Sequence, residues 1–401
     1  MEKLSGVIVC GAGPVGLLTA LGLAREGVKV TLLDADSAIN DSPRAAIYWP
    51  SMQEVLERYG LLEDALAIGH LSTEFQYRSP SDGTIIKIDS SILKGVVRHP
   101  ANLHLGQHLL GGIVLKHLLK YPNAEVRWNT TVTGLSQDAR GVTVTVQSSE
   151  AGPSQQLWAE WIVGADGARS TVRKLLELPF EGHTWPDRFV ATNVRFDFEK
   201  YGFAPTNQVS DPVNWAVVAR LGRDNLWRCT FGEDPQLPEE DAIKRVPERY
   251  AAILPASGPY EIVAARPYRV HERCAPTFRV NRALLAGDAA HVCNPCGGMG
   301  LSTGIVDAAV LAEALGAVIS GVARDSLLDF YSQERRRVYL EVTTPIATHM
   351  KRVLSEADPV LRAQDAANYR QASENPDVGR EALMAPHGVF GKPLPIELHA
   401  R

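Results

Sequence analysis

A glycine-rich turn near the start of the chain has the residue spacing of a phosphate-binding site. Gly11-Ala-Gly13-Pro-Val-Gly16 stands between an apolar run at 7–10 and an apolar segment at 17–25. A Gly-x-Gly-x-x-Gly turn between a strand and a helix brings backbone N–H groups close to a pyrophosphate. Asp34 follows 18 residues after Gly16 at the end of the next apolar run, where a ribose hydroxyl would lie. The segment predicts a dinucleotide site and leaves open which dinucleotide binds.

A second ligand-holding segment spans residues 282–307. A short apolar strand at 283–286 leads into Gly287-Asp288, and a loop with Gly297, Gly298 and Gly300 precedes an apolar helix expected at 301–318. Glycines let the backbone approach a flat ligand, and the start of a helix presents free N–H groups and a positive dipole end. This stretch predicts contact with an electron-rich ligand edge.

A third segment repeats the pattern of strand, glycine turn and carboxylate. The strand at 161–164 is followed by Asp166-Gly167 and then by Ser170 and Arg173. In open α/β sheets, ligands bind in the crevice outside the carboxyl ends of the strands. We therefore expect the turns at Asp166 and Asp288 to deliver their residues to one crevice.

Length and composition indicate a globular chain of two domains. At 401 residues the chain suits two interlocked domains, and its net charge of -5 gives no basic surface for nucleic acid or acidic membranes. Apolar runs are interrupted before membrane-spanning length and no signal-peptide layout is visible, so a cytoplasmic protein is expected. Five cysteines include Cys293 and Cys296 at redox or zinc spacing, but small residues lining a tight loop are the better interpretation, and no metal is expected.

The elements predict an α/β fold, α+β overall, in which a Rossmann-like dinucleotide-binding domain with a parallel sheet carries a β-rich substrate cap. Aromatic residues and strand-like runs concentrate in the cap region. The last fifty residues are polar and partly helical. The expected division is dinucleotide-binding domain 1–72, 101–179 and 281–345, substrate domain 73–100 and 180–280, and a peripheral helical segment 346–401.

Together the three motifs resemble the class A flavoprotein monooxygenases, the para-hydroxybenzoate hydroxylase family of FAD-dependent aromatic hydroxylases. The resemblance spans roughly residues 5–340 and includes a closing helix around Leu327–Arg336. The chain departs from many members at Met299, Leu301 and Ser302. The resemblance implies FAD, NADH or NADPH as co-substrate, O2, and hydroxylation of an electron-rich phenol through a flavin C4a-hydroperoxide.

Carried over by position, the resemblance assigns cofactor roles to residues of all three motifs. Gly11, Gly13 and Gly16 would hold the ADP pyrophosphate, with Asp34 on the ribose. Pro295 is implied as a catalytic residue on the substrate side of the flavin. The remaining cofactor residues implied are Arg44, Gln107, Asp166, Gly287, Asp288, Gly298, Gly300 and Leu301.

Catalytic and pocket residues are less sharply indicated. A phenol reacts faster when ionised, so His291 and His104 are candidate bases or proton relays, although a packing or capping histidine explains His291 better and a partly buried helix-start histidine explains His104 equally well. No arginine cluster is evident in the cap, which slightly disfavours a strongly anionic substrate, although Arg195 or Arg220 could bind a carboxylate. Candidate pocket walls are Tyr48, Arg195, Trp215 and Tyr268.

Several functions share this scaffold. Simple phenols, hydroxypyridines and polyketide phenols are all possible substrates, and the enzyme could be a monomer or a homodimer. A halogenase or a prenyl-chain reductase would use the same FAD motifs, but the Trp-x-Trp-x-Ile-Pro halogenase motif is absent from the sequence. A non-catalytic dinucleotide-binding regulator would not need an aromatic cap.

Overall fold

The computed structural model describes residues 1–41, 45–148, 153–222, 224–254 and 258–396. Its dinucleotide half is built on a six-stranded sheet in which only the edge pair β19–β20 is antiparallel. The central strands are short and apolar, and both of their faces are buried, as parallel sheets require. The strand order is β19 (Arg279–Val280), β20 (Ala283–Leu285), β13 (Trp161–Gly164), β2 (Val7–Cys10), β3 (Val30–Leu33) and β9 (Ala124–Arg127).

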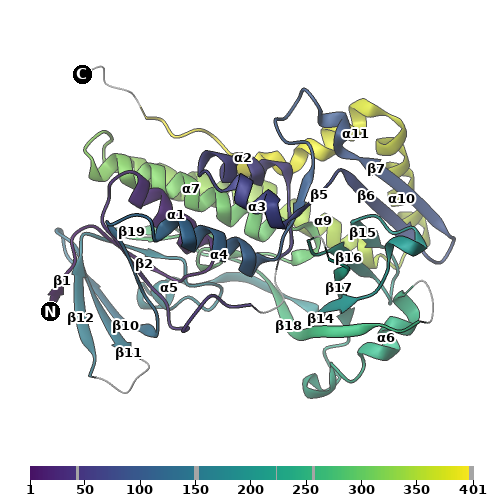
Figure 1. The fold of residues 1–401 in the computed structure, drawn as a ribbon, viewed down its shortest axis with the longest axis horizontal. Helices are drawn as coiled ribbons and strands as arrows, with labels where there is room; N and C mark the ends of the chain where they lie inside the picture. Colours follow the sequence, from purple (N-terminus) through teal and green to yellow (C-terminus); the bar gives the residue numbers. More distant parts are fainter. Residues whose placement is uncertain (42–44, 149–152, 223, 255–257, 397–401) are drawn as a thin grey trace.

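Three helices pack together over this half (Figure 1). They are α1 (Pro14–Arg25), α4 (Gln107–Leu118) and α7 (Met299–Ile319). Helix α7 is long and apolar enough to cross a membrane, but 72% of its apolar window is buried inside the protein, as expected for the core helix of a soluble protein. An outer sheet contains β1 (Glu2–Lys3), β10 (Thr130–Gln137), β11 (Val142–Ser148) and β12 (Gln155–Ala159).

The cap is an eight-stranded sheet that occupies the other end of the molecule (Figure 1). Its two longest strands, β14 (Glu181–Arg195) and β18 (Glu261–Cys274), pair with each other and leave and rejoin the dinucleotide half. The other strands are β6 (Glu74–Ser79), β7 (Thr84–Asp89), β15 (Thr206–Val209), β16 (Ala216–Arg220), β17 (Leu226–Glu233) and β21 (His291–Val292). The expected β-rich cap and parallel FAD half are both present.

A small three-stranded sheet joins the two halves. It contains β4 (Ile47–Tyr48), β8 (Asn102–His104) and β5 (His70–Ser72). The interpretation of His104 as a helix-start residue was wrong, because β8 forms first and α4 begins only at Gln107. Pairing of β8 with both β4 and β5 satisfies its backbone, so His104 is a strand residue.

The remaining helices cover the edges of both halves. Short helices α2 (Pro50–Arg58), α3 (Leu62–Ile68), α5 (Thr171–Leu175) and α6 (Val246–Ile253) follow the strands, and α8 (Ser326–Val338) leads to α9 (Thr344–Ser355). We call α10 (Pro359–Glu374), α11 (Pro376–Met384) and the 3-10 helix Ala385–Phe390 the C-terminal arm. The arm lies beside β6 and β7 (Figure 1).

The C-terminal segment is not peripheral, and this expectation was wrong. Tyr369 of α10 donates from its hydroxyl to Gln208 Oε1 of β15 at 2.6 Å and stacks on Tyr77 of β6 at 4.7 Å. Ser373 donates to the backbone oxygen of Lys87 on β7. The polar surface of the arm concealed these contacts with the cap, which only the folded chain brings together.

Candidate active site

Three neighbouring parallel strands each end in a turn containing a left-handed glycine. β20, β13 and β2 lie side by side, and their carboxyl ends lead into Gly287 (φ 58°), Gly167 (φ 77°) and Gly11 (φ 103°). A residue with a side chain rarely adopts such φ angles. The turns therefore lie at one edge of the sheet, and the expectation that distant motifs meet at one crevice is confirmed.

The packing around the first glycine turn suits a bound dinucleotide. A Cβ on Gly16 would lie 1.9 Å from the Gly11 oxygen, so the strand and α1 pack too closely for any side chain. A Cβ on Gly13 would meet nothing within 4 Å, because Gly13 borders open space at the N-terminus of α1. Tight packing at one glycine and open space at the other suit a pyrophosphate bound at the helix start.

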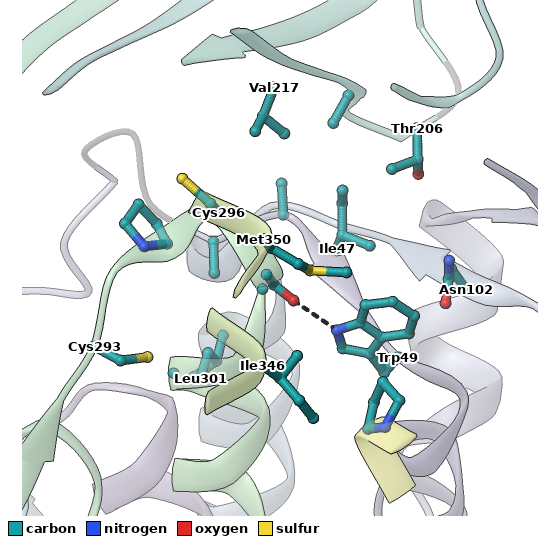
Figure 2. A pocket seen from close by; sticks show the side chains of 18 of the residues that line it. Ile47, Trp49, Asn102, Thr206, Val217, Cys293, Cys296, Leu301, Ile346 and Met350 are labelled. Carbon is teal, nitrogen blue, oxygen red and sulfur yellow. Dashed lines mark hydrogen bonds between the residues drawn. The ribbon is translucent and has the colours of Figure 1, made fainter. Parts of the chain in front are cut away.

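A cavity of about 900 Å³ lies between the cap sheet and the loops that contain Gly13, Asp288 and Pro295, which we call the flavin-side loops. Figure 2 shows Cys293, Cys296 and Leu301 on one side of this cavity, with Val217 and Thr206 of the cap across from them. Trp49 donates from Nε1 to the Gly297 oxygen at 2.9 Å, which ties the loop at 295–301 to the start of α2 (Figure 2). The lining is mostly apolar, as is usual for a site that takes a ring-shaped ligand.

Most cofactor residues expected from the sequence surround this space. Those that line the cavity are Gly13, Gln107, Asp288, Gly298, Gly300 and Leu301, and the expected catalytic residue Pro295 also lines it. Gly11, Gly16 and Gly287 build the turns behind them. Arg44 lies outside the described residues.

Two of the expected carboxylates already have backbone partners. Asp34 accepts hydrogen bonds from the N–H groups of Ala12 and Asp36, although burial raises its pKa. Asp166 accepts from the Ser170 hydroxyl and from the N–H groups at the start of α5. Asp34 therefore stands at the nucleotide turn, whereas Asp166 stabilises the turn after β13.

Of the residues expected to form pocket walls, Tyr268 lines the cavity. Among the described residues, the lining includes none of Tyr48, Trp215 and Arg195. Tyr48 and Trp215 are buried in packed clusters, while Arg195 is half exposed and forms ion pairs with Asp224 and Glu261. Arg220 pairs with Glu199.

The two candidate histidines are both buried behind the cavity wall. His291 forms a 2.7 Å hydrogen bond through Nε2 with Asp307 and stacks on Tyr339, so it belongs to a packed network. His104 contacts the Arg220 oxygen through Nδ1 at 3.0 Å and Thr206 Oγ1 through Nε2 at 3.3 Å. Burial lowers the pKa of His104 to about 4, so it is neutral near pH 7. Thr206 lines the cavity and lies between the cavity and the His104 ring.

Sequence reasoning missed two groups of lining residues. Arg228 of β17 and Arg266 of β18 bring positive charge to the cap wall. The alternating polar residues of 226–233 were a usable signal for Arg228. The other group comes from α9 and the C-terminal arm and includes His349, Met350, Tyr369, Ala382 and Leu383.

Comparison with known proteins agrees with this geometry. The family model described as FAD binding domain matches residues 5–344. A para-nitrophenol 4-monooxygenase of Pseudomonas sp. (strain WBC-3) is 44% identical over 387 residues, covering 96% of each chain. The chain belongs to the class A flavoprotein monooxygenases. It is an FAD-dependent enzyme of the aromatic hydroxylase type, which uses O2 and a reduced nicotinamide.

Two further relatives extend the likeness over the whole monooxygenase. The 6-hydroxy-3-succinoylpyridine 3-monooxygenase HspB of Pseudomonas putida (strain DSM 28022 / S16) is 42% identical over 388 residues, covering 96% of this chain and 98% of HspB. The crystal structure of p-nitrophenol 4-monooxygenase PnpA from Pseudomonas putida DLL-E4 has a TM-score of 0.95 and 44% identity, covering 98% of this chain and all of that one. The C-terminal arm is thus part of the shared fold.

Proposed function

We propose that this monooxygenase acts on a para-substituted phenol or hydroxypyridine and adds oxygen at the ring carbon para to the hydroxyl group. The names of two relatives, at 44% and 42% identity, support this proposal. Each describes attack at a ring position that lies para to a hydroxyl and carries a nitro or succinoyl group. The observation that carries the proposal is the apolar cavity of about 900 Å³, closed by polar cap residues opposite the flavin-side loop.

The residues of the glycine turns would hold FAD. Gly11, Gly13 and Gly16 would form the pyrophosphate turn, with Asp34 on the ribose. Gln107 and Asp288 would contact the ribityl region, and Gly298, Gly300 and Leu301 would lie against the flavin ring. When bound, FAD supplies the electron and oxygen chemistry of the reaction. The N-terminus of α7 would stabilise negative charge on the ring edge.

The chain itself would orient the ring and exclude water. The loop at 295–301, held by Trp49, would set one face of the site, and the cap sheet would cover the other. Pro295 would lie beside the ring carbon that reacts. His104 would be a proton relay through Thr206, and His291 would position the Gly287-Asp288 turn through Asp307.

The proposal includes the location, oligomeric state and partners of the enzyme. It would act in the cytoplasm as a monomer or homodimer on a small aromatic substrate, with no nucleic-acid or membrane partner. The net charge of -5 and the burial of α7 support this setting. NADH and NADPH both stay candidates for the electron donor.

A substrate panel tests the proposal. Phenols with para nitro, carboxyl or alkyl groups and 2-hydroxypyridines are screened for stimulated NADH and NADPH oxidation, with peroxide measured to detect uncoupling. With 4-nitrophenol, one O2 and one NAD(P)H with a proton would yield benzoquinone, nitrite, water and NAD(P)+, and label from 18O2 would enter the quinone. The proposal fails if no aromatic compound yields an oxygenated product. Dependence on halide would indicate a halogenase, and turnover without O2 a reductase.

A further inference from the structure

The cap wall presents a half-buried cation, Arg228, to the cavity. Side chains of β17 alternate between two faces of the sheet. Trp227, Cys229 and Phe231 pack into a hydrophobic cluster, whereas Arg228 and Thr230 line the cavity. The position of Arg228 is therefore set by the strand register and not by a mobile loop.

Arg228 is held in place by an amide. Its Nε–H donates to Asn193 Oδ1 at 2.7 Å from the directly paired position on β14. Burial lowers the pKa of Arg228 to about 10, with a smaller opposing effect from Tyr268. The guanidinium therefore stays charged at neutral pH, and its positive charge attracts an anion at the cavity wall.

Charge is distributed unevenly across the cavity. Arg266 adds a second cation on the cap side. Among the described lining residues the one carboxylate is Asp288, which lies on the flavin side after β20. An anionic atom of the substrate is thus favoured at the cap wall.

We infer that Arg228 holds the ring oxygen of the substrate as a phenolate. The inference rests on the proposed function, because oxygen entry para to the hydroxyl requires that ring carbon to face the loop at 295–301. The hydroxyl oxygen, at the opposite end of the ring, then faces the cap sheet. An opposite charge within about 4–6 Å lowers the pKa of an acid by roughly 1–3 units. The phenol proton goes to solvent, and the ring oxygen needs no direct contact with a protein base.

Other titratable groups near the cavity do not replace Arg228. Burial lowers the pKa of His104 to about 4 and also lowers that of His349 on α9, so both are neutral above pH 7. Burial raises the pKa of Tyr268, which keeps its hydroxyl protonated. Arg266 is exposed and would add to the positive field from the rim. Arg228 is therefore the half-buried cation of the cap wall that stabilises an ionised phenol.

The ionisation state of the bound ligand tests the inference directly. The oxidised holoenzyme is titrated with 4-nitrophenol from pH 5 to 9 without NAD(P)H, and the visible absorption of 4-nitrophenolate is read after subtraction of the flavin spectrum. In the unmodified enzyme the bound phenol is expected to ionise about 1–3 pH units below the free compound. Arg228→Gln should abolish this shift, Arg228→Lys should keep part of it, and the exposed control Arg195→Gln should keep all of it.

The outcomes separate the inference from the proposed function. An unchanged ligand pKa in the unmodified enzyme, or an equal shift in Arg228→Gln, overturns the inference. Weakened binding of 4-nitrophenol but not of 4-alkylphenols, with an unshifted ligand pKa, would assign Arg228 to the para group and also overturn it. Flavin content and thermal unfolding show whether Arg228→Gln is misfolded. If it is, the ligand pKa measured in Arg228→Lys decides whether the inference holds. An Arg228-dependent shift without any oxygenated product would leave the inference standing while the proposed function falls.

Discussion

Arg335 donates from Nε to Asp307 Oδ1 at 2.7 Å, and both side chains are completely buried. The other carboxylate oxygen accepts from the Gly287 N–H and contacts His291. Although burial would raise the pKa of Asp307, the charge of Arg335 and the hydrogen bond with His291 lower it. The carboxylate thus connects helices α7 and α8 to the turn that carries Asp288.

Loss of this carboxylate should affect both stability and flavin binding. Asp307→Asn or Arg335→Met leaves a buried charge without its opposite, so we expect a loss of about 3–5 kcal/mol in the free energy of unfolding, measured with urea. The Gly287 turn should loosen, and flavin content should fall. Glu313→Ala on the same helix removes an exposed ion pair with Arg58 and should cost less than about 1 kcal/mol. Equal losses for the two positions would contradict the role given to Asp307.

The glycines of the first turn should separate folding from cofactor binding. Gly16→Ala places a Cβ against the Gly11 oxygen, so the apoprotein should lose about 1–3 kcal/mol of stability. Gly13→Ala meets open space, so the apoprotein should unfold almost as the unmodified chain does while FAD affinity drops at least tenfold. Urea unfolding of the apoproteins and FAD titration measure the two effects. Full FAD affinity in Gly13→Ala would rule out the pyrophosphate position.

His104 should make stability depend on pH. Burial lowers its pKa from 6.5 to about 4, so between these values the unfolded chain binds more protons than the native one. Its contribution is complete above pH 6.5 and is lost as the pH falls, by about 2 kcal/mol at pH 5. Urea unfolding at pH 7 and pH 5 should show a smaller difference for His104→Gln. The same pH dependence in both proteins would mean that other groups cause it.

The C-terminal arm should control access to the cavity. Ala382→Trp would fill space at the wall, so we expect KM for the substrate to rise about tenfold, with flavin content unchanged. Val360→Trp, at an exposed position of α10, provides the matched control and should leave KM unchanged. Steady-state kinetics with the substrate from the panel decides between these outcomes. An unchanged KM in Ala382→Trp would show that the arm does not limit binding.

The dinucleotide half was predictable because its signals are local. Gly11, Gly13, Gly16 and Asp34 lie within one strand–helix–strand unit, where spacing along the chain determines spacing in the structure. The turn at Asp288 was found for the same reason, since strand, turn and helix follow one another. Arg44, also expected there, has no described position.

The residues of the cap wall were harder to predict from the sequence. The alternation around Arg228 is visible in the chain, but which face of β17 meets the cavity depends on pairing with β14 and β16, which are distant in sequence. Arg195 is equally basic, yet it lies at the far end of β14, where it forms surface ion pairs. The arm was missed because residues contributed by α10 and α11 become a wall only after they dock on β6, β7 and β15.

The alternation of β17 also has a consequence for how this scaffold can diversify. Positions 228 and 230 line the cavity, while 227, 229 and 231 maintain the core from the opposite face of the same strand. Natural variation or a focused mutant library at the even positions could therefore alter substrate range with little cost to folding. Such separation lets selection change what the enzyme accepts while the architecture stays the same.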